Sequence, residues 1–106
     1  MSQEKILLVC SAGMSTSLLV TKMKDYINAS GLDYEVNAVA SSEALDYAVE
    51  NKVNVILLGP QVRFMEGQFK KALAEYNIPI DLISPVNYGS MNGANVVKQA
   101  QELMSK

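Results

Sequence analysis

Two short segments of the chain are almost continuously aliphatic, and two others alternate between apolar and polar residues. The continuous segments are Ile6–Cys10 and Val53–Gly59, and such runs are typical of strands buried on both faces of a parallel sheet. The mixed segments are Tyr34–Ala40 and Ile78–Ser84. We expect these two at the sheet edges, the second also because Pro79 cannot donate a hydrogen bond to a neighbouring strand.

Four further segments repeat apolar residues at the spacing of a helix. They are Thr16–Ser30, Ser42–Asn51, Gln61–Tyr76 and about Asn92–Ser105. Ser42 is expected to cap the second helix, and Gly31 to follow the end of the first. Each helix is predicted to bury one stripe. The residues of these stripes are Leu19, Met23, Tyr26, Ile27, Leu45, Ala48, Val49, Val62, Met65, Phe69, Leu73, Tyr76, Val96, Val97, Ala100, Leu103 and Met104.

Strands and helices alternate along the whole chain, which predicts an α/β fold with a four-stranded parallel sheet and helices on both faces. Central aliphatic strands joined by right-handed crossovers give the strand order 2-1-3-4. The chain then leaves the first and third strands in opposite directions, and ligands of open α/β sheets bind at such a point. Cys10 follows the first strand and the segment Gly59–Val62 follows the third. Both loops are therefore expected beside the binding crevice.

Composition narrows the possible functions. The 106 residues suit one domain spanning positions 1–106, and the net charge of −2 has no basic footprint for nucleic acid. No apolar run approaches the roughly 20 residues of a membrane helix, and the N-terminus does not resemble a signal peptide. A single cysteine fits a reducing cytosol. We expect a cytoplasmic protein that is not inserted in a membrane, and nothing in the sequence demands more than a monomer.

The chain contains no histidine. This removes the usual general base and the commonest metal ligand, and with one cysteine it excludes zinc fingers and Ser-His-Asp or Cys-His hydrolases. We expect neither a metal nor another cofactor. Any histidine chemistry must come from another protein.

The only cysteine of the chain stands where a strand is predicted to give way to a helix. A helix N-terminus has unpaired N–H groups and a partial positive charge, and a curled strand-to-helix turn adds further backbone donors for an anion. A thiolate is favoured there and is a strong nucleophile, so the loop suits a phosphocysteine. Its phosphate-binding residues are predicted to be Ser11, Ala12, Gly13, Met14, Ser15, Thr16 and Ser17.

Two other interpretations of this loop have to be weighed. A lone cysteine at a strand end is often a small buried hydrophobe, and serine and threonine there can be simple helix caps. Low-molecular-weight tyrosine phosphatases place an arginine at the sixth residue after such a cysteine and use an aspartate before a proline as acid. Here the sixth residue is Thr16, and no Asp-Pro pair exists. The loop therefore lacks the groups that would promote hydrolysis of a phosphocysteine, and it is better suited to carrying a phosphoryl group.

The segments "ILLVCSAGMSTSLLVTKM", "VILLGPQV" and "NYGSMNG" closely resemble the cytoplasmic IIB component of the bacterial sugar phosphotransferase system, in its lactose/cellobiose (chitobiose) class. The resemblance spans essentially the whole chain and is closer to the cellobiose branch. It implies the low-molecular-weight tyrosine phosphatase fold and a phosphoryl group on Cys10. Pro60 and Gln61, in the second crevice loop, would shape the pocket or the docking surface. The role of Tyr88 and Gly89 is left open, with an ordinary loop as one alternative.

The same resemblance implies two partners. A phosphohistidine of a IIA component would phosphorylate Cys10, and a membrane-embedded IIC component would present the disaccharide that receives the group. Docking is expected around the crevice rim, at Met14, Gln61, Val62 and Arg63, with a place in the core as an equal alternative for Val62. A regulatory module whose phosphorylation state is read by a partner is one alternative function, and a phosphatase or arsenate-reductase-like enzyme is a weaker one.

Overall fold

The computed structural model describes residues 4–11 and 14–105, and for residues 14–16 the description is limited to the backbone. Its strands form one sheet in the order β2-β1-β3-β4, and every neighbouring pair is parallel. The bounds of the strands are β1 (Glu4–Cys10), β2 (Tyr34–Ala40), β3 (Val55–Leu58) and β4 (Ile80–Leu82). The predicted strand order is confirmed, with the two aliphatic strands in the centre and the two mixed ones at the edges.

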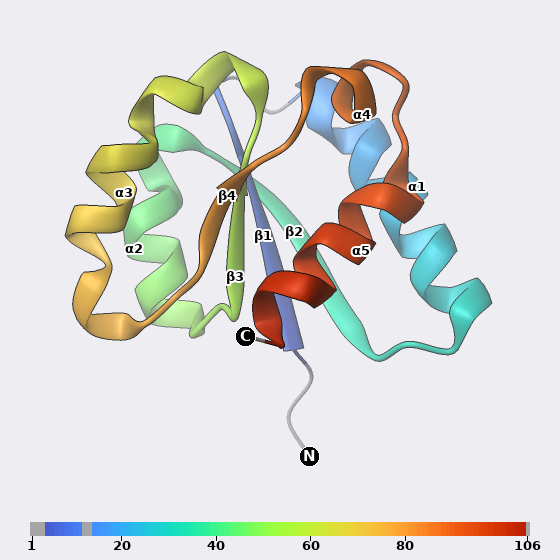
Figure 1. Cartoon of the computed structure of the whole chain (residues 1–106), viewed down its shortest axis with the longest axis horizontal. Coiled ribbons are helices and arrows are strands. Elements are labelled where there is room, and N and C mark those ends of the chain that lie inside the picture. The colour runs from blue at the N-terminus through green and yellow to red at the C-terminus, as the bar shows by residue number, and fades with distance from the viewer. Residues whose placement is uncertain (1–3, 12–13, 106) are drawn as a thin grey trace.

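Helices cover both faces of the sheet (Figure 1). On one face lie α1 (Met14–Ser30), α4 (Pro85–Gly89) and α5 (Gly93–Met104). On the other lie α2 (Ser41–Asn51), the 3-10 segment η1 (Pro60–Met65), α3 (Glu66–Ala72) and the 3-10 turn η2 (Ala74–Tyr76). Among the described residues, no helix combines the length and the apolar character needed to cross a membrane.

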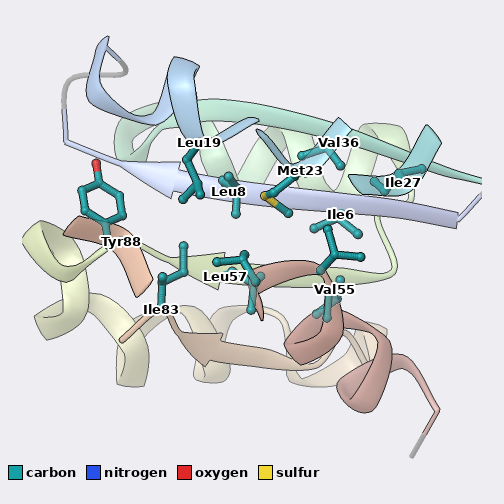
Figure 2. Close-up of a cluster of buried hydrophobic side chains, with 13 residues drawn as sticks. Ile6, Leu8, Leu19, Met23, Ile27, Val36, Val55, Leu57, Ile83 and Tyr88 are labelled. Atoms are coloured by element: carbon teal, nitrogen blue, oxygen red, sulfur yellow. The ribbon is translucent and has the colours of Figure 1, made fainter. Parts of the chain in front are cut away.

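Side chains alternate along the central strands and so divide the core into two halves. Ile6 and Leu8 of β1 point to the face of α1 and α5, whereas Leu7 and Val9 point to the face of α2 and α3. Figure 2 shows the first half, in which side chains of α1 pack over those of β1 and β3. Because all four of these β1 side chains are at most 1% exposed, the strand that ends in Cys10 is anchored on both faces.

Helix α5 crosses α1 at very close range, and Gly93 makes this possible. A Cβ atom placed on Gly93 would lie 2.5 Å from the carbonyl carbon of Lys22 and 2.6 Å from the nitrogen of Met23. Both atoms belong to the backbone of α1, so no side-chain movement could make room. The absence of a side chain at Gly93 therefore sets the distance between the two helices.

Two expectations about the helices are wrong. The stripe of Gln61–Tyr76 is not one helix, because η1 contains the non-helical Val62 (φ −120°, ψ 18°) and α3 ends at Ala72. Pro60 starts this segment, and the chain needs the irregular turn to bring it from the end of β3 back onto the sheet. Ser42 does not cap α2, which begins one residue earlier and has Ala40 at its N-cap, without a side-chain hydrogen bond.

Most of the predicted buried stripes are confirmed, and two of their members are wrong. Val49 is 37% and Tyr76 is 48% exposed. Val49 lies in the last turns of α2, and Tyr76 lies in the separate turn η2, outside α3. Gly31 follows α1 with φ +70°, as expected of a residue that ends a helix.

Helix α5 begins with a side-chain cap, which yields a prediction about stability. The side-chain oxygen of Asn92 accepts a hydrogen bond from the backbone nitrogen of Asn95 at 3.0 Å. Asn92→Ala is expected to lower the free energy of unfolding by about 1 kcal/mol, since an N–H group of the first turn loses its partner. Urea unfolding measures this. Asn92→Asp keeps the acceptor oxygen and should remain within about 0.5 kcal/mol of the wild type, and equal losses in both variants would contradict the capping role.

Candidate functional site

The ends of β1 and β3 lie side by side, and each is followed by one of the two loops singled out in the sequence. Cys10 is the last residue of β1 and Gly59 directly follows β3. The backbone nitrogen of Gly59 donates a hydrogen bond to the carbonyl oxygen of Val9 at 2.9 Å. Beyond this point the chain turns from β1 to the face of α1 and from β3 to the face of α3. The two loops are therefore neighbours, as predicted.

Cys10 is 2% exposed in the structure. Its thiol donates a hydrogen bond to the carbonyl oxygen of Val39 on β2, with the sulfur 3.7 Å from that oxygen. The alternation of β1 places its side chain on the face of α1, with Ile6 and Leu8. A buried hydrophobe would show the same low exposure, so burial alone does not distinguish the two interpretations of this residue. Its position at the strand end, ahead of a helix, is what bears on chemistry.

Helix α1 begins at Met14, four positions after Cys10 and two residues before the predicted start. Ser11 is exposed at a bend between strand and helix, and Ser17 is exposed in the first turns of α1. Met14, Ser15 and Thr16 form the beginning of the helix backbone. Ala12 and Gly13 lie outside the described residues. A helix of 17 residues therefore presents its N-terminus just beyond the cysteine, which is where an anion is stabilised.

The second loop comes from η1. Pro60 opens this segment and Gln61 is exposed beside it. The side chain of Gln61 folds back over the strand end, because its Oε1 atom lies 3.2 Å from where a Cβ of Gly59 would be. Of the residues expected at a docking rim, Gln61 and Arg63 are exposed. Val62 is 2% exposed, so of its two alternatives the place in the core is confirmed and the place at the rim is wrong. The side chain of Met14 is not among those described.

Tyr88 adds an aromatic side chain that the sequence had left without a role. It is 7% exposed and lies in the short helix α4 rather than in a loop. Its Cε1 atom lies 3.6 Å from the Cβ position of Gly59. Figure 2 shows the ring at the end of the core cluster where β1 ends, with the hydroxyl group directed away from Ile83. The only sequence signal for this residue was its place in the segment "NYGSMNG".

Charged and metal-ligating side chains contribute little to this arrangement. Within residues 4–11 and 14–105, no three cysteine, aspartate or glutamate side chains are grouped as a metal ion would require. Lys70 and Glu66 form an ion pair at 3.1 Å on the outer surface of α3. The chemistry available at the strand ends is therefore that of a thiol, backbone N–H groups and hydroxyl groups.

The profile of the family described as "PTS system, Lactose/Cellobiose specific IIB subunit" matches residues 5–99. The chain belongs to this family. Members are phosphotransferase subunits of the sugar phosphotransferase system. The resemblance that the cysteine loop and the segment after β3 indicated is thus confirmed for nearly the full length of the IIB subunit.

Relatives of this IIB subunit cover it almost end to end. The oligo-beta-mannoside-specific EIIB component of Bacillus subtilis is 42% identical over 101 residues, which are 95% of this chain and 96% of that one. The cellobiose-specific EIIB component of Lactococcus lactis is 41% identical over 108 residues, covering 99% of this chain and 100% of that one.

Two solved structures share the fold of the IIB subunit. The cellobiose-specific IIB component of Borrelia burgdorferi has a TM-score of 0.80 at 33% identity, over 98% of this chain and 94% of that one. The lactose-specific IIB domain of Streptococcus pneumoniae has a TM-score of 0.84 at 18% identity, over 96% and 98% of the two chains. The predicted fold, that of low-molecular-weight tyrosine phosphatases, is confirmed.

Proposed function

We propose that residues 1–106 form one IIB domain that carries a phosphoryl group on Cys10, from a IIA component to a sugar bound by a membrane IIC component. The observation that carries this proposal is the place of the only cysteine. It ends the central strand β1 directly ahead of the N-terminus of α1, in a family of phosphotransferase subunits. The absence of histidine from the chain agrees with a donor imidazole on a separate protein.

In the first step, the thiolate of Cys10 attacks the phosphorus of a phosphohistidine of IIA. An S–P bond forms while the N–P bond breaks, and the electron pair of that bond stays on the imidazole nitrogen, which takes up a proton. The proton of the thiol has left to water beforehand. The new phosphoryl group is dianionic. Its proposed hydrogen-bond partners are the backbone N–H groups of residues 11–17, because these residues lead into α1 and form its first turn.

In the second step, a hydroxyl oxygen of the sugar attacks the same phosphorus. The S–P bond breaks and the sulfur leaves as a thiolate, while the hydroxyl proton passes to a base of IIC or to water. No arginine stands at position 16, where it would stabilise attack by water. We propose that this absence preserves the phosphocysteine until the sugar arrives.

The scheme gives the protein two partners, a IIA donor and a membrane-embedded IIC component that holds the accepting sugar. We propose that the protein itself stays on the cytoplasmic side, works without metal or cofactor and acts as a monomer. The names of the relatives include cellobiose- and oligo-beta-mannoside-specific components. We propose that the sugar is a disaccharide or short oligosaccharide of this β-linked class.

Two transfers with purified components test the proposal. Phosphorylated IIA should add one phosphoryl group to this protein, in a form that has the lability of an S-phosphoryl group. Membranes with the cognate IIC should then remove it only when sugar is present. A protein that stays unmodified contradicts the carrier function. Discharge without sugar, or turnover of a small aryl phosphate by the protein alone, would instead favour the regulator or the hydrolase.

Three large apolar side chains are exposed on elements that follow the strand ends. Leu18 in α1 is 51% exposed, Phe64 in η1 is 80% exposed and Val86 in α4 is 78% exposed. Their elements follow the carboxyl ends of β1, β3 and β4, at the upper end of the sheet in Figure 1. Exposed apolar side chains around a site mark a protein contact surface. We propose that IIA docks on them, because both proteins must meet at Cys10.

The double variant Phe64→Ser, Val86→Ser is expected to raise the KM for phosphorylated IIA about tenfold while leaving kcat nearly unchanged, because central apolar contacts carry much of the binding energy of an interface. Initial rates at varied IIA concentration measure this. The matched control is Tyr76→Ser, since Tyr76 is 48% exposed in η2, ahead of β4 rather than after a strand end. An equal increase in KM for the control would place the docking surface elsewhere.

A further inference from the structure

We propose that the hydroxyl group of Tyr88 donates a hydrogen bond to the phosphoryl group on Cys10, and so stabilises the phosphorylated form of the protein. This inference rests on the proposed carrier function. It assigns a side-chain donor to a site whose other proposed donors are mostly backbone N–H groups. It also gives a role to a residue that neither the cysteine loop nor the loop after β3 contains.

The first support is the position of the ring. A Cβ atom on Gly59 would lie 3.6 Å from Cε1 of Tyr88 and 3.3 Å from the carbonyl oxygen of Val9. Val9 precedes Cys10 in the chain, so the ring packs over the joined ends of β1 and β3. Tyr88 lies on the face of the sheet that α1 covers, with Ile6 and Leu8 of β1. Because side chains alternate along a strand, the side chain of Cys10 belongs on the same face as those of Ile6 and Leu8. Tyrosine, thiol and helix N-terminus thus share one face and one end of the sheet.

The second support is the chemical identity of the residue. Of the thirteen buried side chains drawn in Figure 2, only that of Tyr88 carries an oxygen or nitrogen atom. A tyrosine hydroxyl can donate a hydrogen bond to a phosphoryl oxygen, whereas a phenylalanine at this position could only pack. Figure 2 shows the hydroxyl at the edge of the cluster beside the end of β1, whereas the ring faces the aliphatic interior. The one polar group of this cluster is therefore placed at the site.

The third support is the way in which Tyr88 is held. Ser84 caps α4 by accepting a hydrogen bond from the backbone nitrogen of Asn87 at 3.1 Å. The carbonyl oxygen of Asn87 accepts from the backbone nitrogen of Asn92 at 2.9 Å, and its side-chain oxygen accepts from Asn95 at 3.2 Å. This short helix is thereby tied to the beginning of α5. A fixed backbone presents the phenol in one orientation, which a donor to a phosphoryl oxygen requires.

The effect expected from this hydrogen bond is thermodynamic. A hydroxyl that donates to a dianionic oxygen makes a charge-assisted hydrogen bond, whose loss shifts an equilibrium by about tenfold or more. The bond exists only while sulfur carries the phosphoryl group. Removing the hydroxyl should therefore shift the phosphoryl exchange between IIA and this protein toward IIA.

Tyr88→Phe tests this with the full chain and a phosphorylated IIA component as the probe. The equilibrium constant for phosphoryl exchange should fall about tenfold in the variant, and the phosphorus NMR resonance of the S-phosphoryl group should shift. Thermal unfolding gives a second readout, because phosphorylation should raise the Tm of the wild type by more than that of the variant. Tyr76→Phe is the matched control and should behave as the wild type, since Tyr76 lies in η2.

The outcomes separate this inference from the carrier function. Wild type and Tyr88→Phe with the same exchange constant, resonance and gain in Tm would overturn the role of Tyr88 and leave the carrier function intact. A lower Tm in both forms of the variant with an unchanged exchange constant would show a purely structural role and would also overturn it. A wild type that accepts no phosphoryl group would overturn both proposals.

Discussion

Cys10→Ser is expected to abolish acceptance of the phosphoryl group from IIA, with a loss of at least about a thousandfold in rate. A serine hydroxyl at neutral pH is a far weaker nucleophile than a thiol, and the chain has no histidine to activate it. Transfer of labelled phosphate from IIA measures the rate, and intact mass shows whether one phosphoryl group is bound.

The fold of this variant should survive, which separates chemistry from stability. Serine is close to cysteine in size, and the hydrogen bond from the thiol to the carbonyl oxygen of Val39 is long, at 3.7 Å from sulfur to oxygen. We expect the free energy of unfolding to change by about 1 kcal/mol or less. A folded Cys10→Ser protein that still takes up one phosphoryl group at the wild-type rate would contradict the role of the thiol.

Gly93→Ala is expected to lower the free energy of unfolding by about 3 kcal/mol. The added methyl group would stand 2.5 to 2.7 Å from three backbone atoms of Lys22 and Met23, so α1 and α5 must move apart. Val96, Val97 and Ala100, which are fully buried next to this contact, would then lose packing. Urea unfolding followed by circular dichroism measures the loss.

Gly67→Ala is the matched control for this variant. Gly67 lies in α3, and a Cβ atom placed on it would meet nothing within 4 Å. Alanine there should raise the free energy of unfolding by about 0.5 kcal/mol, because it restricts the unfolded chain and favours the helix. If both alanine variants change stability in the same direction, close helix contact is not what Gly93 provides.

The pattern of apolar residues was sufficient to predict the sheet. β1 and β3 are recognisable because they are continuously aliphatic, and β2 has the bounds that were predicted for it. The segment after β3 was not predictable in the same way. Val62, Met65, Phe69 and Leu73 keep a helical spacing although the backbone breaks at Val62, because a 3-10 turn and an α-helix can present the same side chains to one sheet.

The parts of the candidate site that lie at strand ends could be predicted from the sequence, but the parts that are set by side-chain packing could not. Topology alone places Cys10 beside the loop of Pro60 and Gln61, since parallel strands end at the same edge. The place of Tyr88 near the site was not predicted, because this residue follows an edge strand and lies in a short helix that has no periodic pattern of apolar residues. The exposure of Phe64 and the burial of Val62 depend on how η1 turns, which a helical pattern does not reveal.

The parallel pairing of β1 has a consequence for how the protein matures. Each backbone partner of this strand comes from a distant part of the chain: Cys10 lies opposite Ala40, and Val9 lies opposite Leu58. Such non-local pairing forms slowly. The cysteine and the turn after β3 are brought together by the pairing of β1 with β3, which are far apart in the chain. Because Cys10 is the proposed acceptor, we expect phosphoryl acceptance by a refolding protein to depend on this pairing.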